Sequence, residues 1–220
     1  MAILLWLMFE SWSRVGEALR LTARSVIPAY RPQSPSELHG DTTTRVAIIL
    51  NNSLYETPGK TGDFDHVVPL DLERHCRLST VLLHLVESAA PLSLLFPFTY
   101  QGVRAHFLAA EKALGLTPIH PSVHSLRHGG ASHDAACHVR TLPQIQQRGN
   151  WRSISNVKRY EKSSLLGREW LKLPPSTRQT LEENGSLLLN SSEESFEELF
   201  RLPRGLCTKS LSTFSLASPK

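Results

Sequence analysis

The first part of the chain contains a helical pattern, then a loop, then two strand-like runs. Over residues 1–24, apolar side chains recur near helical spacing and predict a single helix. Residues 25–44 hold three prolines among Ser, Gly and Thr, a composition that predicts a loop. Two runs rich in β-branched side chains, 45–52 and 66–71, flank a Pro-Gly and Gly-Asp turn region. They predict a β-hairpin with Lys60 near its tip.

Helical patterns dominate the rest of the chain. An apolar face recurs over residues 72–89 and again over 100–114, and each predicts a helix. Further along, one helix is expected to begin near Ser122, a short one over LPQIQQRG to stop at Gly149, and another in SISNVKRYEKS to be capped by Ser155. Together these elements predict a mixed α+β fold, mostly helical, with a small antiparallel sheet.

The character of the sequence changes toward its C-terminal end. Pro174 and Pro175 are expected to end the preceding helix, because proline lacks the N–H that an internal helical turn needs. Residues 191–202 predict a short acidic amphipathic helix, and the Ser-rich final stretch KSLSTFSLASPK is expected to be disordered. We therefore divide the chain into one folded domain over 1–172 and a C-terminal extension over 173–220.

Composition and charge fit a soluble globular chain that is mildly basic. Of the 220 residues, 40% are hydrophobic and 20% are charged. Lys and Arg number 24 against 20 Asp and Glu, so the net charge is +4, and the isoelectric point is about 9.1. This balance permits a nucleic-acid partner without requiring one, because the distribution of charge matters more than its sum.

Cysteine usage and the N-terminal segment bear on the compartment. The three cysteines are far apart and form no C-x-x-C pair, which disfavours a disulfide framework and a cysteine-based zinc site. The pattern fits an intracellular, reducing compartment, the nucleus in a eukaryote or the cytoplasm in a bacterium. The apolar start MAILLWLMF is too short to span a bilayer and lacks the features of a signal peptide, so no membrane partner is expected.

Residue types that suit phosphodiester chemistry stand in order in one stretch of the chain: His124 and Arg127 one helical turn apart, then Trp151 in GNWRS, then Tyr160 in VKRYEK. Transfer of a DNA phosphate to a side chain needs a nucleophilic oxygen, cations on the non-bridging oxygens and an acid for the leaving sugar oxygen. Arginine binds phosphate in bidentate fashion and stays protonated. Lysine can be the acid, and a tyrosine phenol leaves readily enough to make the attack reversible.

These motifs resemble a known family. HSLRHGG, GNWRS and NVKRYEK are similar to the carboxy-terminal half of the tyrosine recombinase (phage-integrase-like) catalytic domain, in which an H-x-x-R pair precedes a His or Trp and then the nucleophilic tyrosine. Upstream, SRVGEALRLTARSVIP resembles the family's first arginine motif, R-x-x-E, and KTGDFDHVVPL resembles its β-hairpin lysine motif. Four motifs in the family's order, over residues 1 to about 170, make the resemblance specific.

The resemblance implies a fold, an integrase-like catalytic core, and a role for each matched residue. Arg14 and Arg127 would hold the scissile phosphate. Tyr160 would attack it and form a 3′-phosphotyrosyl bond, and Lys60 would protonate the departing 5′ oxygen. A 5′ hydroxyl from a partner strand would then attack the phosphotyrosine and rejoin the DNA. Because the covalent intermediate keeps the energy of the broken bond, no cofactor, ATP or metal ion is expected.

Three more matched residues would support this reaction. His124 would accept the tyrosine proton or orient the phosphate. Trp151 would fill the family's His/Trp place and donate its indole N–H to the phosphate, and Glu17 would support the framework around Arg14.

The partner that the resemblance implies is double-stranded DNA, in integration or site-specific recombination of mobile-element origin. Basic residues beside Trp151 and Tyr160 are expected to lie close to DNA phosphates and to make binding salt-dependent; they are Arg148, Arg152, Lys158 and Arg159. A homo-oligomer on DNA is also expected, formed through the helix predicted over 191–202. On this resemblance, we expect this chain to lack the family's N-terminal core-binding domain, since the first matched arginine is already at residue 14.

Several alternatives stay open. The chain could be a non-catalytic DNA-binding remnant of a mobile-element recombinase, or a type IB topoisomerase, which shares the chemistry. A metal-dependent hydrolase is disfavoured. His124 and His128 stand at i and i+4 in H-S-L-R-H, but the glutamate of a zincin is absent and Arg127 would repel a cation. His128 and His133 are instead expected to be surface or helix-packing residues.

Overall fold

The computed structural model describes residues 1–28, 45–51, 65–161 and 163–190. These residues form a mixed α+β fold, mostly helical, with one three-stranded antiparallel sheet, as the sequence predicts. The strands are β1 (Val26–Pro28), β2 (Val46–Leu50) and β3 (His66–Leu70). The helices are α1 (Ala2–Ser11), α2 (Val15–Leu19), α3 (Cys76–Glu87), α4 (Tyr100–Ala113), α5 (Ser125–Ala136), α6 (Leu142–Arg148), α7 (Ile154–Val157), α8 (Ser163–Leu171) and α9 (Pro175–Asn190). Two 3-10 turns also matter below, η3 (Glu73–His75) and η5 (Lys158–Glu161).

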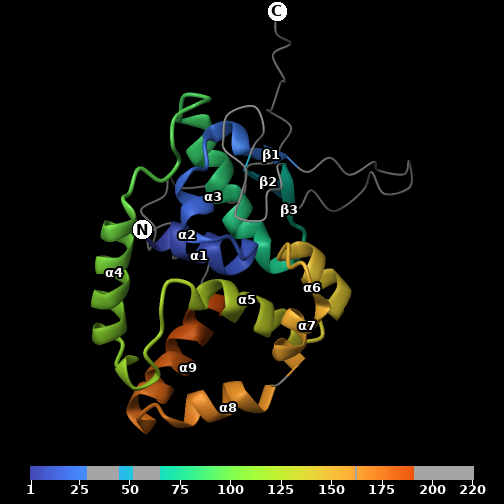
Figure 1. Cartoon of the computed structure of the whole chain (residues 1–220). Helices are drawn as coiled ribbons and strands as arrows, with labels where there is room; N and C mark the ends of the chain where they lie inside the picture. The colour runs from blue at the N-terminus through green and yellow to red at the C-terminus, as the bar shows by residue number, and fades with distance from the viewer. Residues whose placement is uncertain (29–44, 52–64, 162, 191–220) are drawn as a thin grey trace, which may run out of the picture.

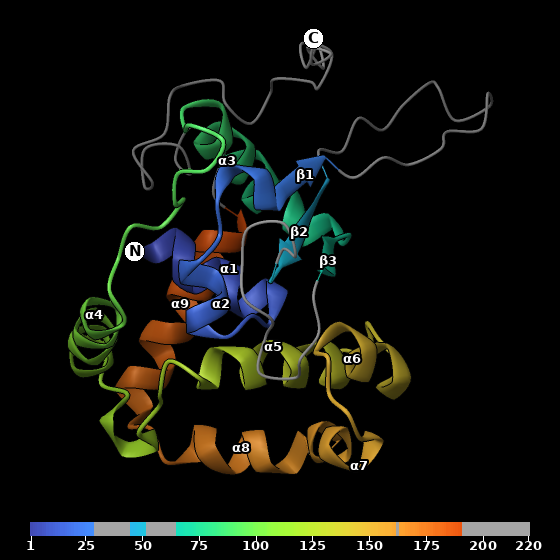
Figure 2. The ribbon, with the colours of Figure 1, turned by 45° about the horizontal axis from the view of Figure 1, so that its top comes forward.

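Helix α1 lies at the centre of the fold, between the sheet and α3 on one side and α5 on the other (Figures 1 and 2). Helix α4 runs along one flank, and α8 lies at the end opposite the sheet. Buried side chains form two clusters. The larger one joins α1, α3 and the sheet, and the smaller one, around Trp12, joins α5, α6, α7 and η5.

The predicted strand pair is confirmed. β2 and β3 are antiparallel, with Leu50 opposite His66 at the end nearest their connection. That connection, which carries Lys60, lies outside the described residues. The pairing therefore places the two ends of the connection side by side, while the position of the lysine stays a prediction.

The loop predicted over 25–44 needs a correction at its start, because residues 26–28 form the edge strand β1. Val26 pairs with Ile48 of β2 and is buried. Pro28 ends this edge strand, where a missing N–H does not interrupt a central ladder. The prolines that predict a loop therefore do not exclude a short strand before it.

The single helix predicted over 1–24 is wrong, because the chain turns at Trp12. Trp12 has a φ of 54°, in the left-handed region, and it ends α1 at Ser11. A non-glycine residue in this conformation costs on the order of 1–2 kcal/mol. Burial of the indole, which is 1% exposed, offsets that cost. Apolar residues continue on both sides of the turn, so their spacing does not reveal the break.

The two helices predicted in the middle of the chain are confirmed. The first is the turn η3 followed by α3. The second is α4, whose N-terminus is capped by Thr99, because its hydroxyl accepts the N–H of Gly102 at 3.0 Å. Gly115 follows α4 with a φ of 66°, a conformation that glycine adopts without steric cost.

The next three predicted helices form with shifted ends. α5 begins at Ser125 rather than near Ser122, and α6 ends before Gly149 as expected. The cap predicted at Ser155 is wrong. α7 begins at Ile154, and the hydroxyl of Ser153 accepts the N–H of Ser155 at 3.2 Å. Ser153 and Ser155 both precede helical residues and both have a side chain that suits an N-cap. The sequence alone therefore does not show which of them caps α7.

The break predicted at Pro174 and Pro175 is confirmed, but the hydrophobic pattern does not predict the helix α9 that follows. Pro175 occupies its first position, where a missing N–H has no helical partner. Thr177 of α9 lies against Gly115 after α4. The acidic helix predicted over 191–202 and the Ser-rich tail lie outside the described residues. Of the helices that the structure describes, none combines the length and apolarity that a bilayer crossing requires.

A chain of ionic contacts links α1, the segment around η3, α5 and the turn before α6. Its members are paired charged or ionisable side chains: Glu10, Arg74, His75, Asp134, Arg140 and Asp71. Arg74 bridges Glu10, at 3.1 Å, and Asp134, at 2.5 Å. The N–H of Leu72 donates to Nδ1 of His75, so its Nε2 carries the proton and donates to Glu10 at 2.9 Å. Burial alone would raise the pKa of Glu10, but its bonds to His75 and Arg74 lower it.

Candidate active site

Tyr160 lies in the turn η5 and is only 4% exposed. Its hydroxyl is 2.6 Å from Nδ1 of His128 on α5. Its ring lies 5.3 Å from that of Trp151, between centroids. Burial raises the pKa of Tyr160, while Arg159 and Arg127 oppose that shift. The phenol is therefore protonated at neutral pH and directed at an imidazole.

Arg127 is the second buried polar residue of the site. It projects from α5, is 3% exposed, and places its guanidinium carbon 4.7 Å from the centre of the Trp151 ring. Nη1 donates to the carbonyl of Trp12 and Nη2 to the carbonyl of Gly149. Burial, and then the charge of Arg14, lower the pKa of Arg127 to about 10. The group thus remains a cation at neutral pH, held by the backbone of two separate segments.

Close packing of glycines fixes this arrangement. A Cβ on Gly130 of α5 would overlap the carbonyl oxygen of Phe9 and the indole of Trp12. A Cβ on Gly149 would overlap the ring of Trp151. α1 can therefore approach α5, and the indole of Trp151 can lie over the end of α6, only because these positions lack side chains.

Arg14 and Glu17 form the pair that the R-x-x-E motif predicts. Arg14 is the N-cap of α2, and its backbone N–H donates to Oε2 of Glu17 at 2.7 Å. Its Nη1 donates to Oε1 of the same carboxylate at 2.6 Å. Glu17 is buried and Arg14 is partly exposed. The spacing of three thus has a local cause, because a glutamate at the third helical position reaches back to the cap.

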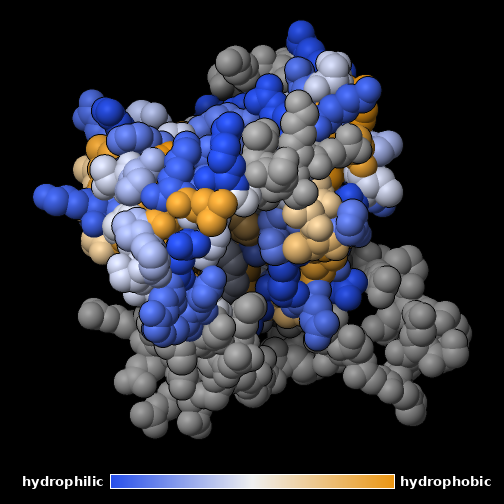
Figure 3. Space-filling model, turned by 90° about the horizontal axis from the view of Figure 1, so that it is seen from below, coloured by the Kyte–Doolittle hydropathy of each residue, from blue (hydrophilic) through white to orange (hydrophobic). Residues whose placement is uncertain are grey.

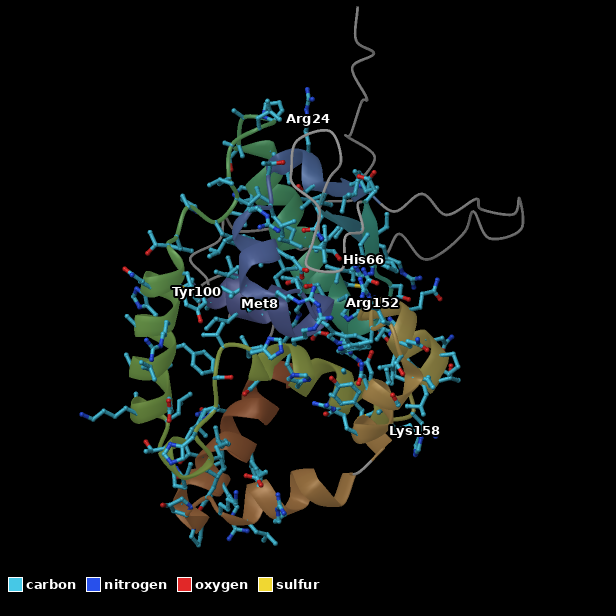
Figure 4. The ribbon with its side chains drawn as sticks, in the orientation of Figure 1. Met8, Arg24, His66, Tyr100, Arg152 and Lys158 are labelled. Carbon is cyan, nitrogen blue, oxygen red and sulfur yellow. The ribbon has the colours of Figure 1, made fainter. Side chains whose placement is uncertain are left out.

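A cavity of about 600 Å³ opens beside this pair. Its wall combines cationic and aromatic side chains from α2, α4 and the start of α5, and these include Arg14, Arg20, Tyr100 and His124. Tyr100 lies at the start of α4, on the side that faces α2 (Figure 4). A hollow with these groups suits an anionic ligand that carries a flat ring.

His124 lines this cavity, but His128 is the histidine that contacts the tyrosine. The His124 ring meets the edge of the His128 ring at 4.6 Å between centroids, and His128 meets Tyr160. His128 does pack between helical segments, as expected, but its hydrogen bond to the Tyr160 hydroxyl was not predicted. The signal was present in the sequence, because His128 follows His124 by four residues and so lies on the same face of a helix.

His66 is a second residue that the sequence analysis missed. It is the first residue of β3, and the hairpin brings it within electrostatic range of Glu17, Arg127 and Arg148. Burial is the largest of the causes that lower its pKa, and the two arginines lower it further. A histidine after a turn carries no spacing signal, so only the strand pairing reveals its proximity.

The four basic residues expected at DNA divide into two groups. Arg152, Lys158 and Arg159 are exposed, and Lys158 points away from α5 (Figure 4). Arg148 differs, because it is only 7% exposed. It donates to the carbonyls of Pro69 at 2.6 Å and Glu10 at 2.8 Å. This guanidinium joins α6 to α1 and β3 and does not face solvent, which corrects its expected place at the surface.

The face seen from below is mostly hydrophilic around a central hollow (Figure 3). Within the described part of the chain, no three His, Cys, Asp or Glu side chains gather as a metal site would require. The side chains that meet at the site are a phenol, imidazoles and guanidiniums.

Comparison with known proteins adds no assignment. The chain matches no protein-family model, and neither the curated proteins nor the solved structures contain a match to it.

Proposed function

We propose that this chain is a DNA strand transferase of the tyrosine recombinase type, with an integrase-like catalytic core. The observation that carries the proposal is one cluster in which the Tyr160 hydroxyl lies 2.6 Å from an imidazole, while Tyr160 and Arg127 contact the same indole. Residues from α5, η5 and the segment after α6 meet there. The four sequence motifs supply the order of the residues, and this cluster supplies a nucleophile beside a cation.

In the cleavage step, Oη of Tyr160 gives up its proton and attacks the phosphorus of a DNA phosphodiester. A bond forms between phosphorus and Oη, and the bond from phosphorus to the 5′ oxygen breaks. That oxygen takes up a proton, for which the resemblance assigns Lys60. In rejoining, a 5′ hydroxyl attacks the phosphotyrosine, and Oη recovers its proton. The number of phosphodiester bonds is conserved, so the cycle needs no ATP.

The guanidiniums suit the charge that develops on the phosphate. A guanidinium has five N–H donors, and Arg127 donates one hydrogen bond to each of two backbone carbonyls. Those bonds fix its plane before any substrate arrives, which reduces the reorganisation needed during the reaction. Arg14 stands at the cavity with Nη1 directed at Glu17. A phosphate near both arginines would also relieve the repulsion between them.

Burial of Tyr160 sets a condition on the proposal. Its hydroxyl must leave the small cluster to reach a DNA phosphate. The turn η5 that carries it is a 3-10 turn, which has weaker hydrogen-bond geometry than an α-helix. We therefore place the required movement in η5, with α5 and its arginine remaining fixed.

The exposed residues Arg152, Lys158 and Arg159 are the part of this surface that would contact DNA phosphates. Binding should weaken as salt rises, because each neutralised phosphate releases counterions. DNA as substrate places the protein inside the cell, in the nucleus of a eukaryote or the cytoplasm of a bacterium. Recombination further requires two or more copies on DNA, and residues 191–202 are the segment that we propose for that contact.

One observation favours a second candidate, a DNA-binding remnant without strand-transfer activity. Tyr160 is buried, and two donors of Arg127 are spent on backbone carbonyls. A protein that had lost catalysis could keep both features for stability alone.

Capture of a covalent adduct separates the two candidates. The full chain is incubated, in EDTA, with a library of nicked, end-labelled duplexes whose sequence around the nick is randomised. The nick lets the short 5′ fragment diffuse away, so the intermediate accumulates. The enzyme gives a labelled protein band on a denaturing gel, and Tyr160→Phe gives none. Binding without any adduct would support the remnant and overturn the proposed function.

A further inference from the structure

The contact between His128 and Tyr160 assigns a proton acceptor that the sequence motifs do not. We propose that His128, and not His124, takes the proton from Tyr160 when that residue attacks a phosphate. This inference rests on the proposed function. It concerns one proton in the cleavage step, which leaves Oη of Tyr160 and arrives at Nδ1 of His128.

The geometry joins the nucleophilic oxygen directly to a ring nitrogen. Oη of Tyr160 and Nδ1 of His128 are 2.6 Å apart, and the rings meet at 5.9 Å between centroids with a 35° interplanar angle. A neutral phenol can donate one proton, and a neutral imidazole has one nitrogen that accepts. The proposed transfer requires that Nδ1 accepts this bond and that Nε2 carries the ring proton. Transfer along this bond yields a phenolate and an imidazolium, and the movement proposed for η5 brings the phenolate oxygen to the phosphate.

Charges around the ring keep His128 neutral before the reaction. They come from His124 and Arg127 on its own helix and from Arg159 on η5, where Tyr160 also faces it. Burial first, and these cations next, lower the pKa of His128 to about 4. The imidazole is therefore unprotonated at neutral pH, and its lowered pKa makes it a weak base while no phosphate is bound. A bound phosphate anion would stabilise the imidazolium, so transfer becomes favourable once DNA occupies the site.

His124 is placed for a different task. It is the N-cap of α5, is exposed, and lines the cavity together with Arg14. The ring contacts run from His124 to His128 and from His128 to Tyr160. His124 is therefore positioned to face a phosphate in the cavity, while His128 faces the nucleophile.

The test compares His128→Gln with a matched control, His133→Gln, in the full chain. Both residues are histidines of α5, but His133 is exposed and packs beside Phe9. Glutamine can still accept a hydrogen bond from Tyr160 but cannot take its proton. On the nicked duplex library, we expect adduct formation to slow by about 100-fold in His128→Gln. His133→Gln should match the wild-type rate.

A second substrate shows whether His128 removes the proton of the Tyr160 nucleophile or supplies the proton of the leaving 5′ oxygen. Nicked duplexes with sulfur in place of the bridging 5′ oxygen have a leaving group that needs no acid. The loss in His128→Gln should persist on this substrate if His128 serves the nucleophile. Recovery to the wild-type rate would place His128 at the leaving group and overturn the inference. The acidic limb of the wild-type rate against pH should also disappear in His128→Gln.

Two further measurements test the inference even if the His128→Gln protein does not fold. Added imidazole should restore part of the rate to His128→Ala, whereas no rescue would contradict the inference. In the wild-type chain, ¹⁵N spectra of the histidines should show His128 with a bare Nδ1 and a protonated Nε2, and the opposite tautomer would overturn it. If wild type forms an adduct and His128→Gln keeps its rate, this inference alone fails. If wild type forms none, the proposed function fails as well.

Discussion

The guanidinium of Arg127 joins segments that are far apart in the sequence, because it donates to the carbonyl of Trp12 and to that of Gly149. The left-handed turn at Trp12 directs one of these carbonyls at α5. The residue that we propose for phosphate binding thus also holds two segments of the chain together. Its two functions should be separable, because a lysine keeps the charge but not the fork.

We predict that Arg127→Lys lowers the free energy of unfolding by about 1.5–3 kcal/mol, the value of a hydrogen bond to a charged group. One buried carbonyl would lose its donor, since an ammonium cannot reach both acceptors in the same geometry. Urea unfolding measures the change. Arg159→Lys is the control, because Arg159 is exposed, and it should stay within about 0.5 kcal/mol of wild type. Equal losses of unfolding free energy in the two variants would contradict the structural role that we assign to Arg127.

The sequence predicts part of this cluster at the residue scale. Arg127, Trp151 and Tyr160 lie together as the motifs predict, whereas their catalytic roles stay a prediction. The contact of His128 with Tyr160 was not predicted, because the i, i+4 spacing from His124 shows a shared helix face but not which residue of η5 meets that face. Arg148 was misplaced because the sequence shows a charge but not its depth. Whether a guanidinium lies in the core depends on carbonyls from α1 and β3, which the local sequence does not contain.

At the scale of elements, the close crossing of α1 over α5 positions the residues around Trp12 that surround the candidate site. Gly130 allows the crossing, because a side chain there would meet the Phe9 carbonyl and the Trp12 indole. Trp12 then lies in the small cluster that also holds Tyr160. The separation of α1 and α5 therefore sets where Arg127 finds its carbonyl acceptor.

Gly130→Ala should destabilise the fold by about 1–3 kcal/mol, the usual cost of overpacking a core. Gly167→Ala on α8 is the matched change, because nothing lies within 4 Å of a Cβ at that position. It should be neutral or stabilise by up to about 1 kcal/mol, since alanine favours a helix over glycine. Thermal unfolding of both variants gives the comparison. A Gly130→Ala protein as stable as Gly167→Ala would exclude close contact between α1 and α5.

The elements themselves were predictable to different degrees. β-branched runs predict β2 and β3, because side chains that suit a pleated sheet are chosen locally. The division of the first helix was not predictable, because the turn at Trp12 is stabilised by burial against α5, far along the chain. α9 was not predictable for a different reason, because its apolar pattern is weak and it starts at a proline, which more often signals a break.

At the scale of the whole molecule, the ionic chain from Glu10 to Asp71 connects both halves of the fold and should make stability depend on pH. The pKa of Glu10 and that of Asp71 are lowered by their cationic partners, although burial alone would raise each of them. The unfolded chain then binds protons at these carboxylates before the folded chain does. Stability is therefore present above their ordinary values of 4.5 and 3.8 and is lost as pH falls below them.

His128 also makes the folded state less stable as pH falls, but it does so at higher pH than the two carboxylates. Because its folded pKa is about 4 against an ordinary 6.5, the unfolded chain binds an extra proton between these values. We expect urea midpoints to decline gradually as pH falls below 6.5 and more steeply below 4.5. His128→Gln should reduce the slope of the upper part, to which His66 also contributes, and Glu10→Gln should flatten the lower part. Midpoints that stay constant down to about pH 3.5 would contradict both assignments.

The central claim is that Tyr160 becomes covalently joined to DNA. The most direct measurement digests the trapped protein–DNA adduct with protease and nuclease and identifies the modified peptide by mass spectrometry. The account predicts a nucleotide on the tyrosine of the peptide that contains VKRYEK, formed in EDTA and absent from Tyr160→Phe. An adduct on another residue, or none from a wild-type chain that binds the duplexes, would contradict it.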